Sequence, residues 1–283
     1  MAPRTQLLRP GVPVLRRSPG VLQVGLAGPV VRLPDVPAVR GLLDELTAPA
    51  GHLPAPSPGE LSDEAATALR RLVEAELVVP AAADPPAYLL AQAGPDAVRR
   101  QEARAAVAIA LDASPAVDAL LTPLLAAARL GRATTPDEAT VRLVVADGPH
   151  HRERLDPLVR GSVPHLLVAG DATGVRIGPF VVPGRTACLR CVDAHESLRD
   201  ERLPLLVAQA ARQCAERPPP RDPVLDRLAL AWAVRDLTRF AEGAEPSTWS
   251  STVDLGPAGA PLVTRWGRHP WCGCAWDGFL DLP

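Results

Sequence analysis

Two tight pairs of cysteines are the residues of this chain best placed to do chemistry. Cys188 and Cys191 stand in CLRC, and Cys272 and Cys274 stand in CGC. Thiolates two to four residues apart can ligate one ion from a single turn, and two such pairs fill a tetrahedral zinc shell without leaving a position for substrate. The spacing therefore predicts a structural zinc site, which typically contributes about 10–16 kcal/mol of apparent binding free energy at neutral pH.

Disulfide pairing is the alternative chemistry for these four cysteines. It requires an oxidising compartment, whereas residues 1–15 contain arginines and prolines and no apolar stretch of signal-peptide length. The sequence therefore favours zinc ligation in a cytoplasmic protein over a disulfide framework.

The side chains around the cysteine pairs have weaker patterns. Cys214 lies within a helical apolar pattern, so it is expected in the core rather than as a nucleophile. Asp193 and His195 follow Cys191 on one predicted helical turn. There they either hydrogen-bond the thiolates, line a groove or cap the surface.

The remaining histidines give little indication of catalysis. His165 begins a Leu-Leu strand and is expected to be a core residue. His269 is close to CGC, but four thiolates already complete a zinc shell. The sequence assigns no role to His150 and His151, which follow a glycine on a predicted loop. No serine, histidine and acid set and no paired-carboxylate pattern indicates a hydrolase.

Composition restricts the classes of protein to which the chain can belong. Its 283 residues are 47% hydrophobic, enough for one large or two smaller domains. No apolar run reaches the 18 residues that a membrane span requires, so a soluble, cytoplasmic protein is expected. The formal net charge of −2 argues against a broad nucleic-acid surface. The sequence contains neither lysine nor asparagine, a bias that indicates a GC-rich genome.

The first part of the chain has the pattern of a small α+β domain. A hairpin is predicted around Ser18–Gly20, followed by a short strand over residues 30–33. Asp35 and Ser62 are the predicted caps of two amphipathic helices. This order within residues 1–90 matches a winged-helix outline.

Residues 91–283 have the pattern of a second, larger α/β domain. Strands over 103–111, 141–147 and 165–170 alternate with helices over 115–129 and 152–161, which predicts a parallel, Rossmann-like sheet. Further along, VRIGPFVV is predicted as a hairpin-like strand pair, residues 203–216 and 224–241 as long helices, and the regions near Ser250 and Val263 as strands.

Two cysteine-containing segments carry a family resemblance. In GPFVVPGRTACLRCVDAHESLRD, a frame of Gly178, Pro179, Pro183 and Gly184 precedes the first pair, and RHPWCGC contains the second. Together with VPHLLV, these segments resemble the ThiF-type adenylating fold. The resemblance covers Arg104–Trp276. It is to the divergent branch that partners azole-forming cyclodehydratases in the biosynthesis of ribosomal peptide natural products.

The same resemblance extends to the N-terminal part of the chain and to assembly. About the first 80 residues resemble the PqqD-like leader-peptide recognition module that this branch carries. A resemblance to this branch also implies a homodimer.

The turn that would bind nucleotide phosphate lacks the residues for that role. A βαβ phosphate site requires glycine after the first strand, so that backbone N–H groups approach the phosphates. Here the turn over residues 110–115 reads ALDASP, with a carboxylate and a proline but no glycine. ThiF-type adenylators also use lysine and asparagine beside the nucleotide, and this chain has neither. Asp147 occupies the place of the family's magnesium-binding aspartate or serves as a cap or a solvated charge. Zinc is therefore the expected cofactor, and ATP is not.

These features predict a scaffold that holds a precursor peptide for a separate ATP-dependent cyclodehydratase. The peptide is expected to add as a strand beside residues 30–33, with the helix over 64–74 as the other wall of the groove. The residues predicted to contact it are Val30, Val31, Arg32, Leu33, Leu69, Arg70 and Val73.

Two alternatives remain open from the sequence. One is an active ThiF-type adenylating enzyme with a remodelled nucleotide site. The other is a regulator that binds DNA through Arg16, Arg17, Arg70 and Arg71, which the acidic charge balance disfavours.

Overall fold

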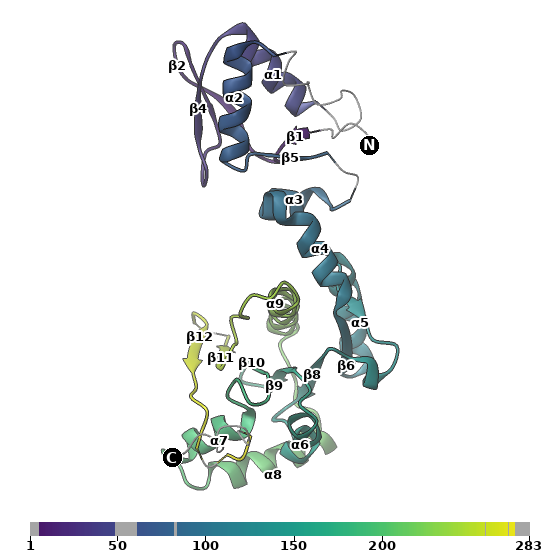
Figure 1. Cartoon of the computed structure of the whole chain (residues 1–283). Helices are drawn as coiled ribbons and strands as arrows, with labels where there is room; N and C mark the ends of the chain where they lie inside the picture. Colours follow the sequence, from purple (N-terminus) through teal and green to yellow (C-terminus); the bar gives the residue numbers. More distant parts are fainter. Residues whose placement is uncertain (1–5, 49–60, 82–83, 258, 271, 275–283) are drawn as a thin grey trace, which may run out of the picture. The chain divides into compact units, whose positions relative to one another are not determined.

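The computed structural model describes residues 6–48, 61–81, 84–257, 259–270 and 272–274 (Figure 1). The chain divides into two compact units, Met1–Glu102 and Ala103–Pro283, whereas the sequence pattern placed a boundary near residue 90. Among the described residues, no helix is long and apolar enough to cross a membrane.

Unit 1 contains a three-stranded antiparallel sheet in the order β2-β3-β4 and a two-stranded pair, β1 with β5. The strands are β1 (Gln6–Leu8), β2 (Val14–Ser18), β3 (Val21–Val24), β4 (Val31–Pro34) and β5 (Val78–Pro80). The helices are α1 (Pro37–Thr47), α2 (Asp63–Glu74) and α3 (Ala87–Ala93), and α4 (Ala97–Ala106) runs across the boundary between the two units. A 3₁₀ turn, η1 (Gly94–Asp96), lies between α3 and α4.

The core of unit 1 follows from its local sequence patterns. In β4 the apolar Val31 and Leu33 are buried while Arg32 is exposed, the period of two expected for a half-buried strand. Helix α2 begins where the Ser62 hydroxyl accepts a hydrogen bond from the Ala65 N–H, as the sequence predicted. The predicted hairpin is confirmed as β2–β3. The likeness of this unit to a winged helix stays a prediction.

Unit 2 is built on a seven-stranded sheet in the order β12-β11-β10-β9-β8-β6-β7. Strands β7, β6, β8 and β9 are parallel, while β10, β11 and β12 are antiparallel. The strands are β6 (Ala108–Asp112), β7 (Gly131–Arg132), β8 (Val141–Asp147), β9 (His165–Gly170), β10 (Val175–Val181), β11 (Ser251–Leu255) and β12 (Leu262–Arg265). The helices are α5 (Pro115–Ala127), α6 (Arg152–Arg160), α7 (Leu189–Ser197), α8 (Leu203–Glu216) and α9 (Pro223–Ala241), with a 3₁₀ turn η2 (Pro136–Glu138).

Helices cover both faces of this sheet (Figure 1). In β9, Leu166 and Val168 belong to the large core shared with α5 and α9, while Leu167 packs with the residues of α6 on the other side. Strands buried on both faces read as continuous apolar runs, which is why HLLVAG was recognised as a strand. The predicted α/β fold is therefore confirmed as a mixed rather than wholly parallel sheet.

Two predicted elements were wrong. Residues 103–106 end α4 instead of beginning a strand, because ARAA is a run of strong helix formers that continues the preceding helix. VRIGPFVV forms one strand, β10, instead of a hairpin. The register shifts between Ile177 and Phe180, so Gly178 and its proline produce a bulge within the strand rather than a turn.

Candidate functional site

The four paired cysteines lie together in unit 2. Their sulfur atoms are all within 4.8 Å of one another, with Cys188 Sγ 3.3 Å from Cys272 Sγ and Cys191 Sγ 3.4 Å from Cys274 Sγ. All four are free thiols. A tetrahedral zinc ion with bonds of about 2.3 Å separates its sulfurs by about 3.8 Å, which is the distance between Cys188 Sγ and Cys191 Sγ. The cluster is consistent with the predicted zinc site.

Local structure explains how two distant segments form this cluster. Cys188 is the N-cap residue of α7 and Cys191 lies in the first turn of that helix, so both sulfurs come from one helix end. In the second segment, Gly273 has a φ of 74°, a conformation that glycine adopts without strain. It allows the chain to turn tightly between Cys272 and Cys274.

Hydrogen bonds among the four thiols act unequally on them, so that the pKa values of Cys191 and Cys274 are lowered while those of Cys188 and Cys272 are raised. The Cys188 thiol donates to Cys191, and with the neighbouring thiols and the backbone N–H of His269 it lowers the pKa of Cys191 from its ordinary value. The His269 nitrogen lies 3.3 Å from Cys191 Sγ. Zinc binds the thiolate form, so a lowered thiol pKa promotes metal binding.

His195 and Asp193, which follow Cys191 in α7, hold the two cysteine-bearing segments in different ways. His195 Nε2 lies 3.0 Å from the Gly267 carbonyl oxygen, and its ring makes an edge contact with His269. It therefore supports the loop that leads to the second cysteine pair. Asp193 instead accepts hydrogen bonds from Arg152, at 2.8 Å for Nε, so it holds α7 against the start of α6.

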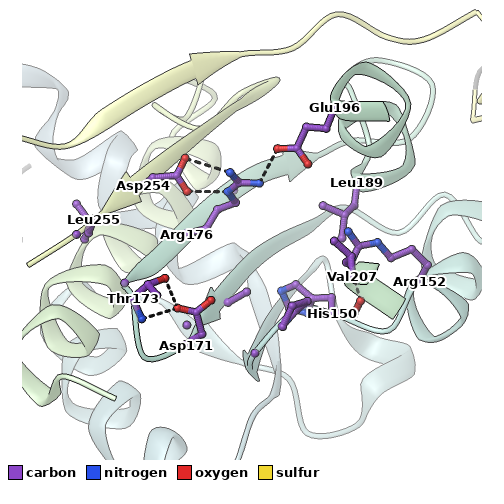
Figure 2. Close-up of a pocket in the computed structure, with 17 residues that line it drawn as sticks. His150, Arg152, Asp171, Thr173, Arg176, Leu189, Glu196, Val207, Asp254 and Leu255 are labelled. Carbon is purple, nitrogen blue, oxygen red and sulfur yellow. Dashed lines mark hydrogen bonds and ion pairs between the residues drawn. The ribbon is translucent and has the colours of Figure 1, made fainter. Parts of the chain in front are cut away.

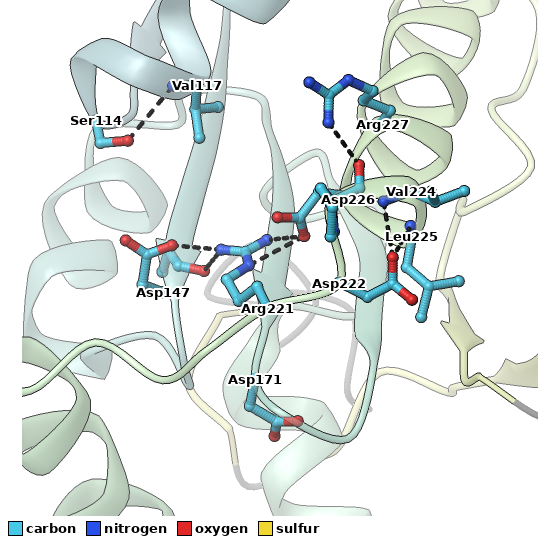
Figure 3. A network of polar contacts seen from close by, with 12 residues as sticks. Ser114, Val117, Asp147, Asp171, Arg221, Asp222, Val224, Leu225, Asp226 and Arg227 are labelled. Carbon is cyan, nitrogen blue, oxygen red and sulfur yellow. Dashed lines mark hydrogen bonds and ion pairs between the residues drawn. The ribbon is translucent and has the colours of Figure 1, made fainter.

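The turn after β6, where the family resemblance would place nucleotide phosphates, contains a helix cap. Strand β6 ends at Asp112, and the Ser114 hydroxyl accepts from the Val117 N–H to begin α5 (Figure 3). Pro115 is the first residue of that helix and provides no N–H for a ligand. This turn lies at the carboxyl end of the sheet beside the point where strand order reverses, where open α/β sheets bind ligands.

A guanidinium occupies the space beside Asp147 at the end of β8. Arg221 forms ion pairs with both Asp147 and Asp226, and it donates to the Ala146 carbonyl at 3.1 Å (Figure 3). Its side chain is only 11% exposed. Asp147 is therefore not a helix cap but a partly solvated charge with an ion-pair partner, since its side chain is 41% exposed.

Helix α8 also covers this end of the sheet. Gly148 has a φ of 97°, and a Cβ built there would lie 2.5 Å from the Cys214 Cβ. Cys214 is half-buried and lines a cavity of about 370 Å³ together with Ser114 and Asp147. The close packing requires a glycine at 148, and it places Cys214 against the loop rather than in the main core.

A separate cavity of about 340 Å³ opens beside β9, β10 and α7. Arg176 crosses it, donating to Asp254 at 2.7 Å and to Glu196 at 3.1 Å (Figure 2). Burial opposes ionisation of Asp171, but hydrogen bonds from Thr173 keep the pKa of that carboxyl below its ordinary value. Sequence patterns did not indicate this cavity, because its residues come from five separate segments.

Two of the histidines are buried and neutral. Desolvation lowers the pKa of His165 to about 4, and its Nδ1 lies 2.8 Å from the Val163 carbonyl oxygen, which matches the predicted core role. Desolvation also lowers the pKa of His150 to about 3, and Arg152 adds to that shift. His150 was missed at the sequence level because a histidine pair on a loop carries no periodic signal.

The residues predicted to hold a peptide lie in unit 1. Val31 and Leu33 are buried under the sheet, whereas Arg32 and Val30 are exposed. On α2, Leu69 is half-buried, while Arg70 and Val73 are exposed. Strand β4 and helix α2 therefore each present exposed residues, and α2 packs next to β4.

Comparison with solved structures establishes the fold. The heterocyclase TruD superposes with a TM-score of 0.73 at 17% identity, over 96% of this chain and 43% of TruD. A heterocyclase in complex with substrate and cofactor gives 0.70 at 15% identity, over 97% of this chain and 40% of that one. MccB from E. coli, solved with ATP, gives 0.61 at 14% identity, over 95% of this chain and 99% of MccB. The chain has the fold shared by TruD and MccB.

The resemblance read from the sequence is thereby confirmed at the level of the fold. No protein-family model and no curated protein sequence matches the chain, so the likeness rests on structure. The chain spans less than half the length of the two heterocyclases that it resembles.

Proposed function

We propose that this chain is a zinc-stabilised scaffold that binds a precursor peptide and presents it to a separate ATP-dependent cyclodehydratase. The observation that carries the proposal is the open edge of β4. Within the described part of unit 1, β4 is the end strand of its sheet and pairs only with β3. An unpaired edge is a template for an added strand, and α2 supplies a second wall beside it.

The backbone register of β4 identifies the groups that a peptide would use. Asp35 N–H donates to the Gly20 carbonyl at 2.9 Å, and Leu33 pairs with Leu22. Because hydrogen-bonded and non-hydrogen-bonded pairs alternate in an antiparallel ladder, the backbone N–H and C=O of Arg32 point outward from the sheet. The added peptide would bond to Arg32, and its side chains would face Leu69 and Val73 on one side.

The groups at the former nucleotide position support a role without ATP. A triphosphate with its magnesium would need the place now taken by the Arg221 ion pairs with Asp147 and Asp226. It would also meet the proline-capped turn before α5, where the first backbone donor is missing. The cyclodehydratase partner would then supply the nucleotide chemistry, and this chain would raise the local concentration of the substrate.

The proposed metal role is structural. Four thiolates fill a zinc shell, so no position is left to polarise a substrate. The ion would fix α7 to the segment with Cys272 and Cys274, while the scaffold's own residues bind the peptide.

Peptide capture tests the proposal. Full-length tagged chain would be recovered from native cells and the co-purifying peptides identified by mass spectrometry, with wild type compared with Arg32→Pro and Arg32→Ala. Proline removes the outward N–H of β4 without touching the β3–β4 ladder, whereas alanine removes only the side chain. We expect a peptide with wild type and Arg32→Ala and at least a tenfold loss, about 1.4 kcal/mol, with Arg32→Pro.

Equal recovery of a peptide with Arg32→Pro would contradict strand addition at β4. Recovery of no peptide and no ATP-using enzyme would contradict the scaffold role itself. A homodimer remains an expectation from the family resemblance, and the elution volume of the full chain on a calibrated column tests it.

A second candidate function is nucleotide use by the chain itself. The likeness to MccB favours this candidate, because MccB was solved with ATP and the superposition covers 99% of MccB. Calorimetry with ATP and magnesium separates the two candidates. Saturable micromolar binding would establish the adenylating role, and absence of binding to a folded, metal-loaded chain would support the scaffold.

The structure adds no support for the DNA-binding alternative. Arg16 and Arg40 both pair with Asp35, and Arg17 donates to the Gln23 side chain. These arginines therefore have partners within unit 1.

A further inference from the structure

The cavity beside β9 and β10 contains one buried polar atom without a partner. His150 is 7% exposed, and its Nε2 has no hydrogen-bond partner among the described residues. A buried polar atom left unpaired costs roughly 1–3 kcal/mol. Figure 2 shows the imidazole at the wall of the cavity, between Asp171 and Arg152. A molecule in the cavity would satisfy this nitrogen.

The free nitrogen of His150 is an acceptor. The Val168 backbone raises the pKa of His150 against the larger effect of burial, as a carbonyl oxygen beside a ring N–H does. Since Nε2 is the atom without a partner, this N–H belongs to Nδ1. A neutral imidazole that donates from Nδ1 accepts at Nε2. The molecule that completes this site must therefore present an N–H or O–H donor.

The charges around the cavity favour a cation. Three carboxylates line it, those of Asp171, Glu196 and Asp254, together with Arg152 and Arg176. Arg152 is neutralised by Asp193, which lies outside this lining. Arg221 also acts on Asp171, but it is paired with Asp147 and Asp226 outside the lining. Arg176 is then the one cation of the lining left to balance three carboxylates, so an excess of negative charge remains. In a partly buried site this excess attracts a positive group.

The rest of the wall accommodates an aliphatic group. Leu189, Val207 and Leu255 contribute apolar surface, and the backbones of several glycines leave room for close approach. The volume of about 340 Å³ lies within the range of small-molecule sites.

We propose that this cavity binds a primary ammonium group carried on a short aliphatic chain. The ammonium donates to His150 Nε2 and neutralises the carboxylates, and the aliphatic part lies against Leu189 and Val207. The same chemistry is available from a free alkylamine or from a lysine side chain of a peptide. This site is distinct from the peptide groove of unit 1, so it does not depend on the function proposed above.

Titration calorimetry of the full-length, metal-loaded chain with 1-aminobutane tests the site. 1-Butanol and butyrate have the same chain length without the positive charge. We expect saturable binding of 1-aminobutane and at least tenfold weaker binding of both analogues. His150→Leu removes the acceptor and Asp171→Asn removes a charge while keeping its carbonyl acceptor, and each is expected to weaken the binding of 1-aminobutane at least tenfold. Glu216→Gln changes an exposed carboxylate outside the cavity and is the matched control, with unchanged affinity.

A second arm identifies the source of the amine. An acetylated Gly-Lys-Gly amide is compared with the same peptide containing acetyl-lysine. Tighter binding of the lysine peptide than of 1-aminobutane supports a peptide side chain, and the reverse supports a free amine. Three results would each overturn the proposal. They are binding of butyrate or 1-butanol as tight as that of the amine, equal affinity for the amine in Asp171→Asn and wild type, and no saturable heat with either amine. Thermal unfolding of each variant verifies that it is folded. If His150→Leu does not fold, Asp171→Asn still tests the proposal.

Discussion

The sulfur atoms of the cysteine cluster differ in the support they receive from the protein. Cys188 and Cys191 are buried and belong to a helix end, whereas Cys272 is half-buried on a loop. The loop is held by the hydrogen bond from the Cys272 N–H to the His269 carbonyl and by the contact of His195 with Gly267. The loop pair is therefore the weaker half of the site.

Removing one loop thiol should release the metal. We expect wild-type protein to contain about one zinc per chain, and Cys272→Ser to retain it much more weakly because three thiolates leave an open position. Metal analysis after dialysis against a mild chelator measures the difference. Cys214→Ser is the matched control, since Cys214 lies outside the cluster, and it should retain zinc. Full retention by Cys272→Ser would contradict four-thiolate ligation.

Burial of His165 predicts a pH dependence of stability. Its pKa is near 6.5 when unfolded and about 4 when folded, so below pH 6.5 the unfolded chain binds a proton that the folded chain excludes. Stability is thus fully present above pH 6.5 and is lost as the pH falls towards 4, by about 3 kcal/mol. Denaturant unfolding at pH 7, 5.5 and 4.5 measures it.

A variant isolates this histidine from other titrating groups. His165→Phe should remove about half of the pH dependence between 6.5 and 4.5, because buried His150 contributes a similar share, whereas His151→Gln at a half-buried position should leave it unchanged. An identical pH profile in His165→Phe and wild type would show that another group causes the acid sensitivity.

At the residue scale, spacing predicted the cysteines but not His150. Two cysteines within one turn indicate shared ligation whatever surrounds them. The burial of His150 arises only when β8, β9 and α6 come together, and no local pattern encodes that arrangement. Asp147 likewise gains its partner from Arg221, 74 positions later in the chain.

Among the elements, the connection from α8 to α9 packs against the carboxyl ends of β8 and β9. It carries Arg221, whose guanidinium links the end of β8 to the first turn of α9 through Asp147 and Asp226. A Cβ at Gly170 would lie 2.6 Å from this guanidinium, so β9 also packs against it.

Arg221→Ala should destabilise unit 2. The change leaves two carboxylates and a carbonyl without their donor, and hydrogen bonds to charged groups contribute about 1.5–3 kcal/mol each, less where the carboxylates are partly exposed. We expect a loss of about 2 kcal/mol in the free energy of unfolding, measured with urea. Arg227→Ala is the control, because among the described residues Arg227 donates to the Pro223 carbonyl one turn away within α9. Equal stability of the two variants would contradict a structural role for Arg221.

Most elements of the fold were predictable because they satisfy a strong local rule. The ends of α8 matched the predicted range, and α9 begins one residue earlier, at a proline suited to the first helical position. The two failures arose where local rules conflict. At β10 a Gly-Pro pair typical of turns sits inside a buried strand, and at α4 an alanine-rich run continues without a break into β6. The pairing of β10 with β11 joins segments that are far apart in the sequence, and no local pattern encodes it.

On the scale of the whole molecule, each unit has its own buried apolar clusters. Unit 1 packs β3, β4, α1 and α2 around residues such as Leu33 and Leu72. Unit 2 packs its sheet against α5 and α9 around residues such as Leu143 and Phe180. The cysteine cluster belongs only to unit 2.

Two thermal transitions are therefore expected for the full chain. Chelation of zinc should lower the midpoint of the transition of unit 2 and leave that of unit 1 unchanged, because the ion stabilises only the unit that binds it. Differential scanning calorimetry with and without chelator measures both midpoints, and Cys272→Ser identifies the transition of unit 2. A single transition that shifts as a whole would show that the units unfold together.

The 84 positions between Cys188 and Cys272 also set an order of events during translation. At 5–20 residues per second, the ribosome takes roughly 4–17 s to synthesise the intervening chain. Throughout that interval the nascent protein displays a CXXC dithiol with only half of its coordination partners. Ligation of one ion by all four thiols would accordingly become possible only late in synthesis, and a truncated product ending before Cys272 would expose a dithiol vulnerable to oxidation.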